Sequence, residues 1–484
     1  ERRLNPLECG WDDTSGMGFL FMIKTGCAKR GPRAPHVQEK AGRNSAVGKR
    51  FATAMTVATD MNIAFPRMMR IRQVFEVTAP VDISTAVAEE MEAVRGDLKP
   101  GMRVAVAVGS RGITNLKEIV AAVIGQLKDA GTEPYIVPAM GSHGGATPEG
   151  QTELLGEYGV TEAAMGAPIR AAMEVDHIGL TPEGYDGYIA REALAADAIV
   201  PINRVKPHTD FAPPLGSGLL KMLVVGLGKR VGAETFHRAA SRYGYESMLR
   251  SISRLIREKA PVLFGVAVVE NSFHQIADIA VVRGADMEPR EEELCAAARS
   301  LMPLLPFEDI DILVVDRIGK NISGSGMDPN VTGRRGHGYS SHLCDREEIS
   351  PDIRRIFVRN LTPQSHGNAV GIGMADAATQ RLVDQIDHHV TDINVQTSNV
   401  FQASKVPMHF DTDREAISLL LRSLVIPDTT QAKVVRISNT LDLNEVEVSE
   451  IYADEISGRD DLEVIDGASD WSFNDDGNLR DLLE

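Results

Sequence analysis

Short apolar runs alternate with segments of helical period between residues 82 and 270. Residues 83–95 and 115–130 have the apolar spacing of amphipathic helices. The apolar runs are short enough to predict buried parallel strands, and they cover residues 103–108, 135–139, 197–203 and 263–270. Strands and helices that alternate at this spacing predict parallel β-α-β units.

A second α/β unit is predicted to begin at residue 309, after SLMPLLPFED ends a helix rich in Glu and Ala. Its expected strands cover residues 309–316, 355–358 and 433–437, and its expected helices cover residues 375–387 and 414–424. We therefore predict an α/β protein of two domains. A doubly wound parallel-sheet domain is expected at residues 61–303 and a smaller α/β domain at residues 304–484, with the functional site in the cleft between them.

The two ends of the chain show no sustained helical or strand pattern. We interpret residues 1–60, rich in Gly, Arg, Ala and Thr, as an extension outside the fold, with a transit peptide as the alternative. Met61 begins a segment, MNIAFPRMMRIRQVFEV, with strand-like apolar spacing. Residues 465–484 are acidic and polar, and we expect them to fray.

Charge and cysteine content narrow the class of protein. The net charge of −17 argues against nucleic acid and anionic membranes as partners, because their phosphates would repel the protein. The four cysteines form no CxxC pair, so neither a zinc site nor a disulfide framework is indicated, and a reducing, cytoplasmic location is expected. No apolar run approaches the length of about 18 residues that spans a bilayer.

A lysine in an apolar run is the first candidate for chemistry. Lys221 lies within LLKMLVVGL, with His208 thirteen residues before it and His237 sixteen residues after it. A buried ammonium is costly unless it is paired, neutralised or used chemically. The alternatives are that Lys221 reaches the surface from an apolar strand and that His237, in ETFHRAA, is an ordinary helix-face histidine.

Three polar loops follow consecutive predicted strands. They are GSRGITN with Arg111, GSHGGATPEG with His143, and NRVKPHTDF with Lys206 and His208. Because ligands of open parallel sheets bind beyond the carboxyl ends of the strands, these loops predict a site for a small anionic molecule and acid/base chemistry. As alternatives, Arg111 makes a structural contact and His143 is a hydrogen-bonded turn residue.

Two further patterns are weaker. The glycines of VVGLGKRVG nearly match a dinucleotide fingerprint, but the third glycine comes one residue late and no acidic residue follows at the expected place. The pairs His388–His389 and His337/His342 lack the spacing of a zinc motif.

The loops resemble those of the lactate racemase family, whose enzymes use a nickel-pincer nucleotide. The resemblance is carried by His143 in GSHGGAT, His208 in KPHTDF, Lys221 in SGLLK and His237 in ETFH. It runs from about Met61 to the end of the sequence. It is particularly close to a subgroup with GSRGI, PAMGSHGGAT and GKNISGSGMDPN loops.

The resemblance implies a racemase or epimerase that inverts C2 of a 2-hydroxy acid. Lys221 would hold the nickel-pincer nucleotide covalently, in a pocket that includes Ser217 and Gly218, and its linked nitrogen would carry no charge. His237 would be the protein ligand to nickel. Other enzymes would have to synthesise the cofactor, and a homo-oligomer is possible.

The same resemblance assigns His143 and His208 as the acid/base pair, one on each side of the substrate. One histidine would remove the hydroxyl proton while hydride leaves C2 for the cofactor, and the planar keto acid would take it back on its other face. Four basic residues would bind the substrate: Arg111, Lys320, Arg334 and Arg335.

This sequence departs from the family pattern at three places. Val108 stands where the lactate racemases carry an Asp, and Gly216 stands at a Glu-like position before Ser217. The loop after Asp328 and Asn330 lacks the Tyr-Gln and Lys of that family. Either its arginines or Lys320 would take over the role of that lysine, and a longer or more polar acid than lactate is expected. Two alternatives stay open: a non-catalytic carboxylate-binding homologue and a Schiff-base lyase that uses Lys221.

Overall fold

Four of the predicted strands are neighbours in one sheet. The computed structural model describes residues 63–76, 79, 81–110, 112–209, 214–334 and 351–482. The first sheet has the order β3-β2-β6-β7-β8. The first four strands are parallel and β8 is antiparallel to β7. Their bounds are β2 Arg103–Val108, β3 Glu133–Pro138, β6 Ala198–Arg204, β7 Phe264–Glu270 and β8 Ile276–Arg283.

Helices cover both faces of this sheet, which confirms the predicted α/β class. Val104, Val106 and Val108 of β2 pack in one core with α2 (Ile83–Glu92) and α3 (Leu116–Asp129). The alternate residues of β2 pack in a second core with three other helices. These are α8 Lys229–Tyr243, α9 Tyr245–Lys259 and α10 Met287–Ser300. This two-residue alternation is the ordinary consequence of strand geometry.

The chain order gives the first sheet a switch point between β2 and β6. From β2 the chain passes to β3 on one side and later to β6 on the other. In open α/β sheets such a point leaves a crevice at the carboxyl ends of the strands, where ligands bind. The loops that follow β2, β3 and β6 therefore meet at the place where a site is expected.

The second sheet has eight strands in the order β12-β11-β10-β9-β13-β14-β1-β15. The strands from β12 to β13 run parallel, whereas β14, β1 and β15 pair antiparallel. Their bounds are β9 Asp309–Ile318, β10 Asp352–Leu361, β11 Ala377–Thr379, β12 Met408–Phe410, β13 Val434–Ile437, β14 Glu445–Ser449, β1 Arg67–Gln73 and β15 Leu462–Asp470.

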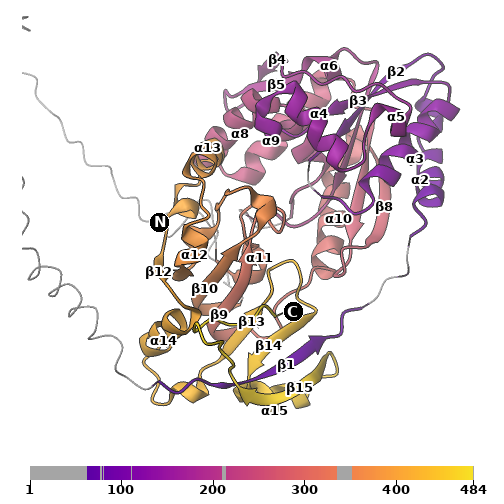
Figure 1. Ribbon diagram of the computed structural model, residues 1–484. Coiled ribbons are helices and arrows are strands. Elements are labelled where there is room, and N and C mark those ends of the chain that lie inside the picture. Colours follow the sequence, from indigo (N-terminus) through magenta and orange to yellow (C-terminus); the bar gives the residue numbers. More distant parts are fainter. Residues whose placement is uncertain are drawn as a thin grey trace, which may run out of the picture. The chain divides into compact units, whose positions relative to one another are not determined.

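Three sequence-based expectations are corrected by the second sheet. The helix expected at residues 375–387 is instead the buried strand β11 followed by the short helix α12 (Gln380–Val383), because the Thr379 side chain caps that helix. Strand β1, which we assigned to the first domain, hydrogen-bonds with β14 and β15 (Figure 1). Residues 465–484 do not fray within their described part, because β15 extends to Asp470 and Trp471 is buried after it.

The remaining elements are short or lie at the margins of the two sheets. Within the described residues, no helix is long and apolar enough to cross a membrane. The further strands are β4 Val175–Leu180 and β5 Asp186–Ala190, and the further helices are α4 Pro148–Glu157, α5 Glu162–Met165, α6 Arg191–Leu194, α7 Leu219–Lys221, α11 Pro329–Thr332, α13 His388–Ser398, α14 Asp413–Ser423 and α15 Ala453–Ser457.

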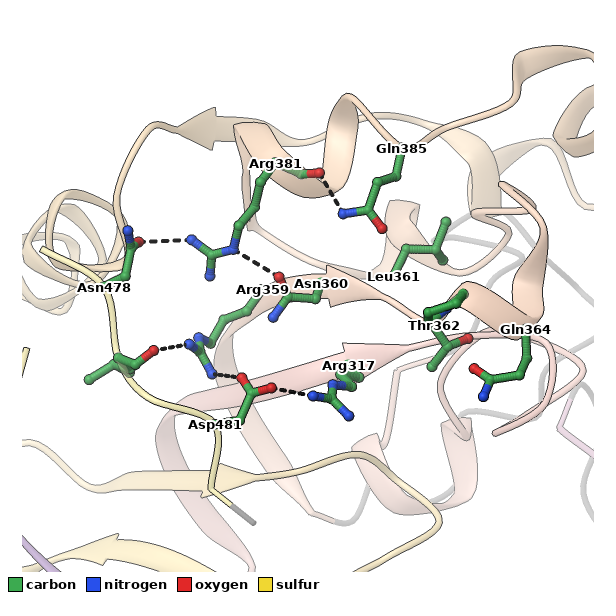
Figure 2. A pocket seen from close by; sticks show the side chains of 12 residues that line it. Arg317, Arg359, Asn360, Leu361, Thr362, Gln364, Arg381, Gln385, Asn478 and Asp481 are labelled. Atoms are coloured by element: carbon green, nitrogen blue, oxygen red, sulfur yellow. Dashed lines mark hydrogen bonds and ion pairs between the residues drawn. The ribbon is translucent and has the colours of Figure 1, made fainter. Parts of the chain in front are cut away.

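A buried ion network ties the end of the chain to the second sheet. The guanidinium of Arg359, on β10, lies 2.6 Å from Asp316 and 2.9 Å from Asp413, and all three side chains are almost fully buried. Asp481 bridges Arg359 and Arg317 beside a cavity of about 610 Å³ (Figure 2). The cavity lies beyond the carboxyl ends of β9 and β10, and the predicted site residues do not line it.

Candidate active site

The loop between β6 and α7 is closed at its base by two backbone hydrogen bonds. The N–H of Lys206 donates to the carbonyl of Ser217 over 2.9 Å, and the N–H of Ser217 donates to the carbonyl of Lys206 over 2.8 Å. A side chain at Gly216 would not fit, since its Cβ would lie 2.1 Å from the Lys206 carbonyl oxygen. This closure brings His208 beside Lys221, whose Nζ hydrogen-bonds with the His208 Nε2.

Lys221 ends helix α7, so the alternative that it leaves an apolar strand is wrong. Helix α7 continues into a π-helical segment, Met222–Gly226, and after a turn into α8. Leu220 and Leu223 are buried beside Lys221, which is itself half-buried. π-helical segments occur frequently at functional sites, because the additional residue in the turn changes which side chains face a common point.

The ring of Tyr245, at the start of α9, packs against the rings of both His208 and His237. Its buried ring lies 6.0 Å from the His208 ring and 6.0 Å from the His237 ring, measured between centroids. His237 lies on α8, where it also packs edge-on against Phe236. The structure therefore brings His208 and His237 to one aromatic ring, and Lys221 is hydrogen-bonded to His208.

His143 lies on the loop after β3, which packs against the π-helical segment and α8. The N–H of Gly141 donates to the carbonyl of Gly226 over 3.2 Å, and a Cβ at Gly141 would lie 3.7 Å from that of Ala233. Ala233 is one helical turn before His237, so the two face the same side of α8. The Nδ1 of His143 hydrogen-bonds with the Ser110 hydroxyl at 2.5 Å, which fixes the imidazole to the end of β2.

A fully buried pair, Lys229 and Gln151, holds the His143 loop in place. The Gln151 amide donates to the carbonyls of Gly141 and His143 over 3.0 and 3.3 Å. The Lys229 Nζ donates to the Gln151 Oε1 over 2.9 Å and to the Pro138 carbonyl over 2.6 Å. The network joins the end of β3, the His143 loop, α4 and the first residue of α8. Burial lowers the pKa of Lys229 to about 8, an effect that Glu174 partly opposes.

This pKa predicts a pH-dependent stability. An unfolded lysine has a pKa of 10.5. Below pH 8 the buried amine is charged, and this buried charge lowers the free energy of unfolding most. Above pH 10.5 the amine is neutral in both states, so this destabilisation is absent. Between these values we expect the free energy of unfolding to rise by about 3 kcal/mol from this group. Urea unfolding from pH 7 to 10 should show less of this rise in Lys229→Met. Lys259→Met, at an exposed position, should match the wild type; equal slopes in all three proteins would contradict the prediction.

The loop around α11 of the second unit reaches the His208 loop. The Asn330 side-chain amide donates to the His208 carbonyl over 3.2 Å, and the Ser325 hydroxyl donates to the Thr209 hydroxyl over 2.9 Å. Lys206 lies 3.7 Å from the buried Asp328 carboxylate. The segment from Ser325 to Asn330, which follows β9 of the second sheet, therefore contacts the loop that carries His208.

Of the four expected substrate-binding residues, the structure describes Lys320 and Arg334. Lys320 donates to the Gly324 carbonyl and to Asn394, which lies 2.8 Å away. Arg334 pairs with Asp376 at 2.6 Å and also donates to backbone carbonyls. Arg111 and Arg335 lie outside the described residues. The substrate-binding roles of all four residues stay predictions.

Several residues of this arrangement were not singled out from the sequence. Tyr245 and Gln151 carry no motif, and Lys229 lies in the glycine pattern that we had weighed as a dinucleotide site. Ser110 and Asn330 belong to loops that were noted for other residues. A signal was present for Lys229 alone, as a second lysine beside an apolar run.

The donor set at this place consists of one amine and separate imidazoles. Within the described ranges, no group of three or more His, Cys, Asp or Glu side chains could hold a metal ion. The arrangement instead offers one amine, Lys221, and separate imidazoles at His208 and His237. An imidazole can bind nickel, and a lysine amine that has lost its proton can act as a nucleophile.

Comparisons with known proteins give one family and one shared fold. The family model of the lactate racemase N-terminal domain matches residues 62–246. The structure of the lactate racemase apoprotein from Thermoanaerobacterium thermosaccharolyticum is similar, with 14% identity over 77% of this chain and 98% of that chain and a TM-score of 0.50. A structural-genomics protein from Thermotoga maritima is 15% identical over 68% of this chain and 85% of that chain, with a TM-score of 0.45. No curated protein matches the chain.

Proposed function

We propose, from the match of residues 62–246 to the lactate racemase N-terminal domain, that the protein is a racemase or epimerase of a 2-hydroxy acid that works with a nickel-pincer nucleotide. The observation that carries the proposal is the hydrogen bond between Lys221 and His208. The ring of Tyr245 lies against both His208 and His237. We propose that Lys221, His208 and His237 serve as the tether, a base and the metal ligand.

In this proposal Lys221 holds the cofactor covalently and His237 binds its nickel. Ser217 and Gly218 lie on the loop that leads into α7, beside the tether. When bound, the cofactor supplies what an imidazole lacks, a reversible oxidation of the hydroxyl-bearing carbon. An amide-like link also removes the charge of Lys221, which suits its position between buried leucines.

His143 and His208 are proposed to exchange the hydroxyl proton of the substrate. They lie on the loops after β3 and β6, which flank β2 on opposite sides. Inversion at one carbon requires groups on both faces of the substrate, and histidines titrate close enough to neutral pH to serve as base and acid in turn.

The proposal is tested by loading the protein with cofactor. We expect chain produced together with the cofactor-synthesis enzymes to contain nickel, and intact-mass analysis with peptide mapping to place an added mass on the peptide containing Lys221. Lys221→Ala should show no such mass, whereas Lys206→Arg, which alters a nearby lysine, should keep it. Full inversion of 2-hydroxy acids by Lys221→Ala would overturn the proposal.

The same preparations separate the two alternative functions. A non-catalytic homologue would bind carboxylates without exchanging the C2 hydrogen for solvent deuterium, even when loaded. A Schiff-base lyase would be trapped at Lys221 by borohydride in the presence of a carbonyl compound. A panel of 2-hydroxy acids of increasing length would then identify the substrate, for which we propose a longer or more polar acid than lactate.

A further inference from the structure

The turn that carries Lys221 rests on helix α10. A Cβ at Gly218 would lie 2.4 Å from the carboxyl carbon of Glu291, so this position requires the close approach that glycine permits. A Cβ at Gly216 would lie 3.0 Å from the sulfur of Cys295, one turn further along α10. The loop 216–218 therefore lies directly on two side chains of α10.

Glu291 makes a hydrogen bond with the beginning of α7. Its Oε2 accepts the backbone N–H of Leu220 over 2.9 Å, and its side chain is 1% exposed. The first N–H groups of a helix have no acceptor within the helix, and α7 is only three residues long. Glu291 thus supplies from another helix the acceptor that the backbone before Lys221 lacks.

The protonation of the Glu291 carboxyl group is affected by its burial. Burial raises the pKa of Glu291 to about 7, and the backbone N–H groups of Leu220 and Leu219 oppose that rise. Among the described residues, its Oε1 has no hydrogen-bond partner. A buried carboxyl group with one bonded oxygen is less costly in its neutral form, which still accepts the Leu220 hydrogen bond.

We propose that Glu291 is a positioning residue for Lys221: by accepting the Leu220 N–H and filling the space beneath Gly218, it sets the direction in which the lysine leaves the helix. The proposal rests on the proposed role of Lys221 as the point of cofactor attachment. Without the acceptor, the buried Leu220 N–H would be unsatisfied, and the turn would move to reach water or another acceptor. Lys221, the next residue, would move with it.

Two substitutions at Glu291 separate the acceptor from the packing. Glu291→Gln keeps a carbonyl oxygen of the same shape for Leu220, and Glu291→Met keeps most of the volume without an acceptor. Glu288→Met is the matched control, because Glu288 lies on the same helix and binds Arg254 and Arg257 instead of α7. Two quantities are measured: hydrogen exchange of the peptide 217–223 in unloaded protein, and the rate at which Lys221 gains the cofactor mass.

We expect Glu291→Met to exchange roughly tenfold faster in this peptide and to gain the cofactor mass at least about tenfold more slowly. Glu291→Gln should restore both, and Glu288→Met should change neither. Wild-type exchange and loading in Glu291→Met would overturn the proposal. If Glu291→Met does not fold, Gly218→Ala crowds the same contact from the loop, and wild-type loading in that variant would overturn it too.

The failure of this inference is distinguishable from the failure of the proposed function. If the wild-type chain itself gains no mass at Lys221, the proposed function fails. The exchange of residues 217–223 in unloaded protein still decides whether Glu291 holds the turn. If the wild type loads and Glu291→Met loads equally well, the function stands and Glu291 has no positioning role.

Discussion

In cofactor-loaded protein, we expect His143→Asn to lower the rate of 2-hydroxyacid inversion by roughly a thousandfold, because acid/base catalysis by a positioned side chain commonly contributes two to four orders of magnitude. Asparagine can still hydrogen-bond with Ser110 but cannot exchange a proton near neutral pH. Chiral chromatography of the product measures the loss, and intact mass verifies that Lys221 is loaded to the wild-type extent.

Ser110→Ala is the graded control for this prediction. It removes the hydroxyl that lies 2.5 Å from the His143 Nδ1 but leaves the imidazole in place. We expect a loss of about tenfold, since only the orientation of the ring is relaxed. An inversion rate within tenfold of the wild type in His143→Asn would remove His143 from the chemistry and leave the acid/base role to other residues.

The second large effect concerns stability. We expect Arg359→Met to lower the free energy of unfolding by about 3 kcal/mol, because it leaves the buried carboxylates of Asp316 and Asp413 with an excess of negative charge. Arg436 still pairs with Asp316, and Arg381 still pairs with Asp413. The expected loss of stability is therefore near the lower end of what breaking a buried ion pair costs. Urea unfolding, followed by the fluorescence of the nearby buried Trp471, measures the change.

Arg317→Met is the matched control at the same cavity. Arg317 pairs with Asp481, but its side chain is 49% exposed, so we expect a loss below about 1 kcal/mol. Equal losses in Arg317→Met and Arg359→Met would show that burial does not distinguish the two ion pairs. That result would contradict the account of the network given above.

The first sheet could be predicted almost completely because its information is local. Strand β2 alternates between two buried faces and has the predicted bounds. The second sheet was harder, since β11 is three residues long and β1 finds its partners at the other end of the chain. No local period encodes such a pairing, because its register depends on side chains that are distant in sequence.

The candidate site shows the same division between local and distant information. His143, His208, Lys221 and His237 were proposed from the sequence because their loops and spacing resemble those of a known family. Glu291 and Gln151 were not, because a buried carboxyl or amide looks like any other polar residue on a helix face until its partner is known. The buried residues that hydrogen-bond with the loops of the candidate site could therefore not be predicted from the sequence.

The place of β1 in the second sheet has a consequence for biosynthesis. Arg67 precedes its partner Glu450 by 383 residues, so at bacterial and eukaryotic rates of translation β1 waits roughly 20 to 80 seconds for that partner to leave the ribosome. The first sheet, whose strands all lie between residues 103 and 283, can close during that interval. Among the described strands, β1 is therefore synthesised first and is among the last to pair. Its unpaired backbone stays exposed on the nascent chain during this interval, and we expect chaperones to bind it there.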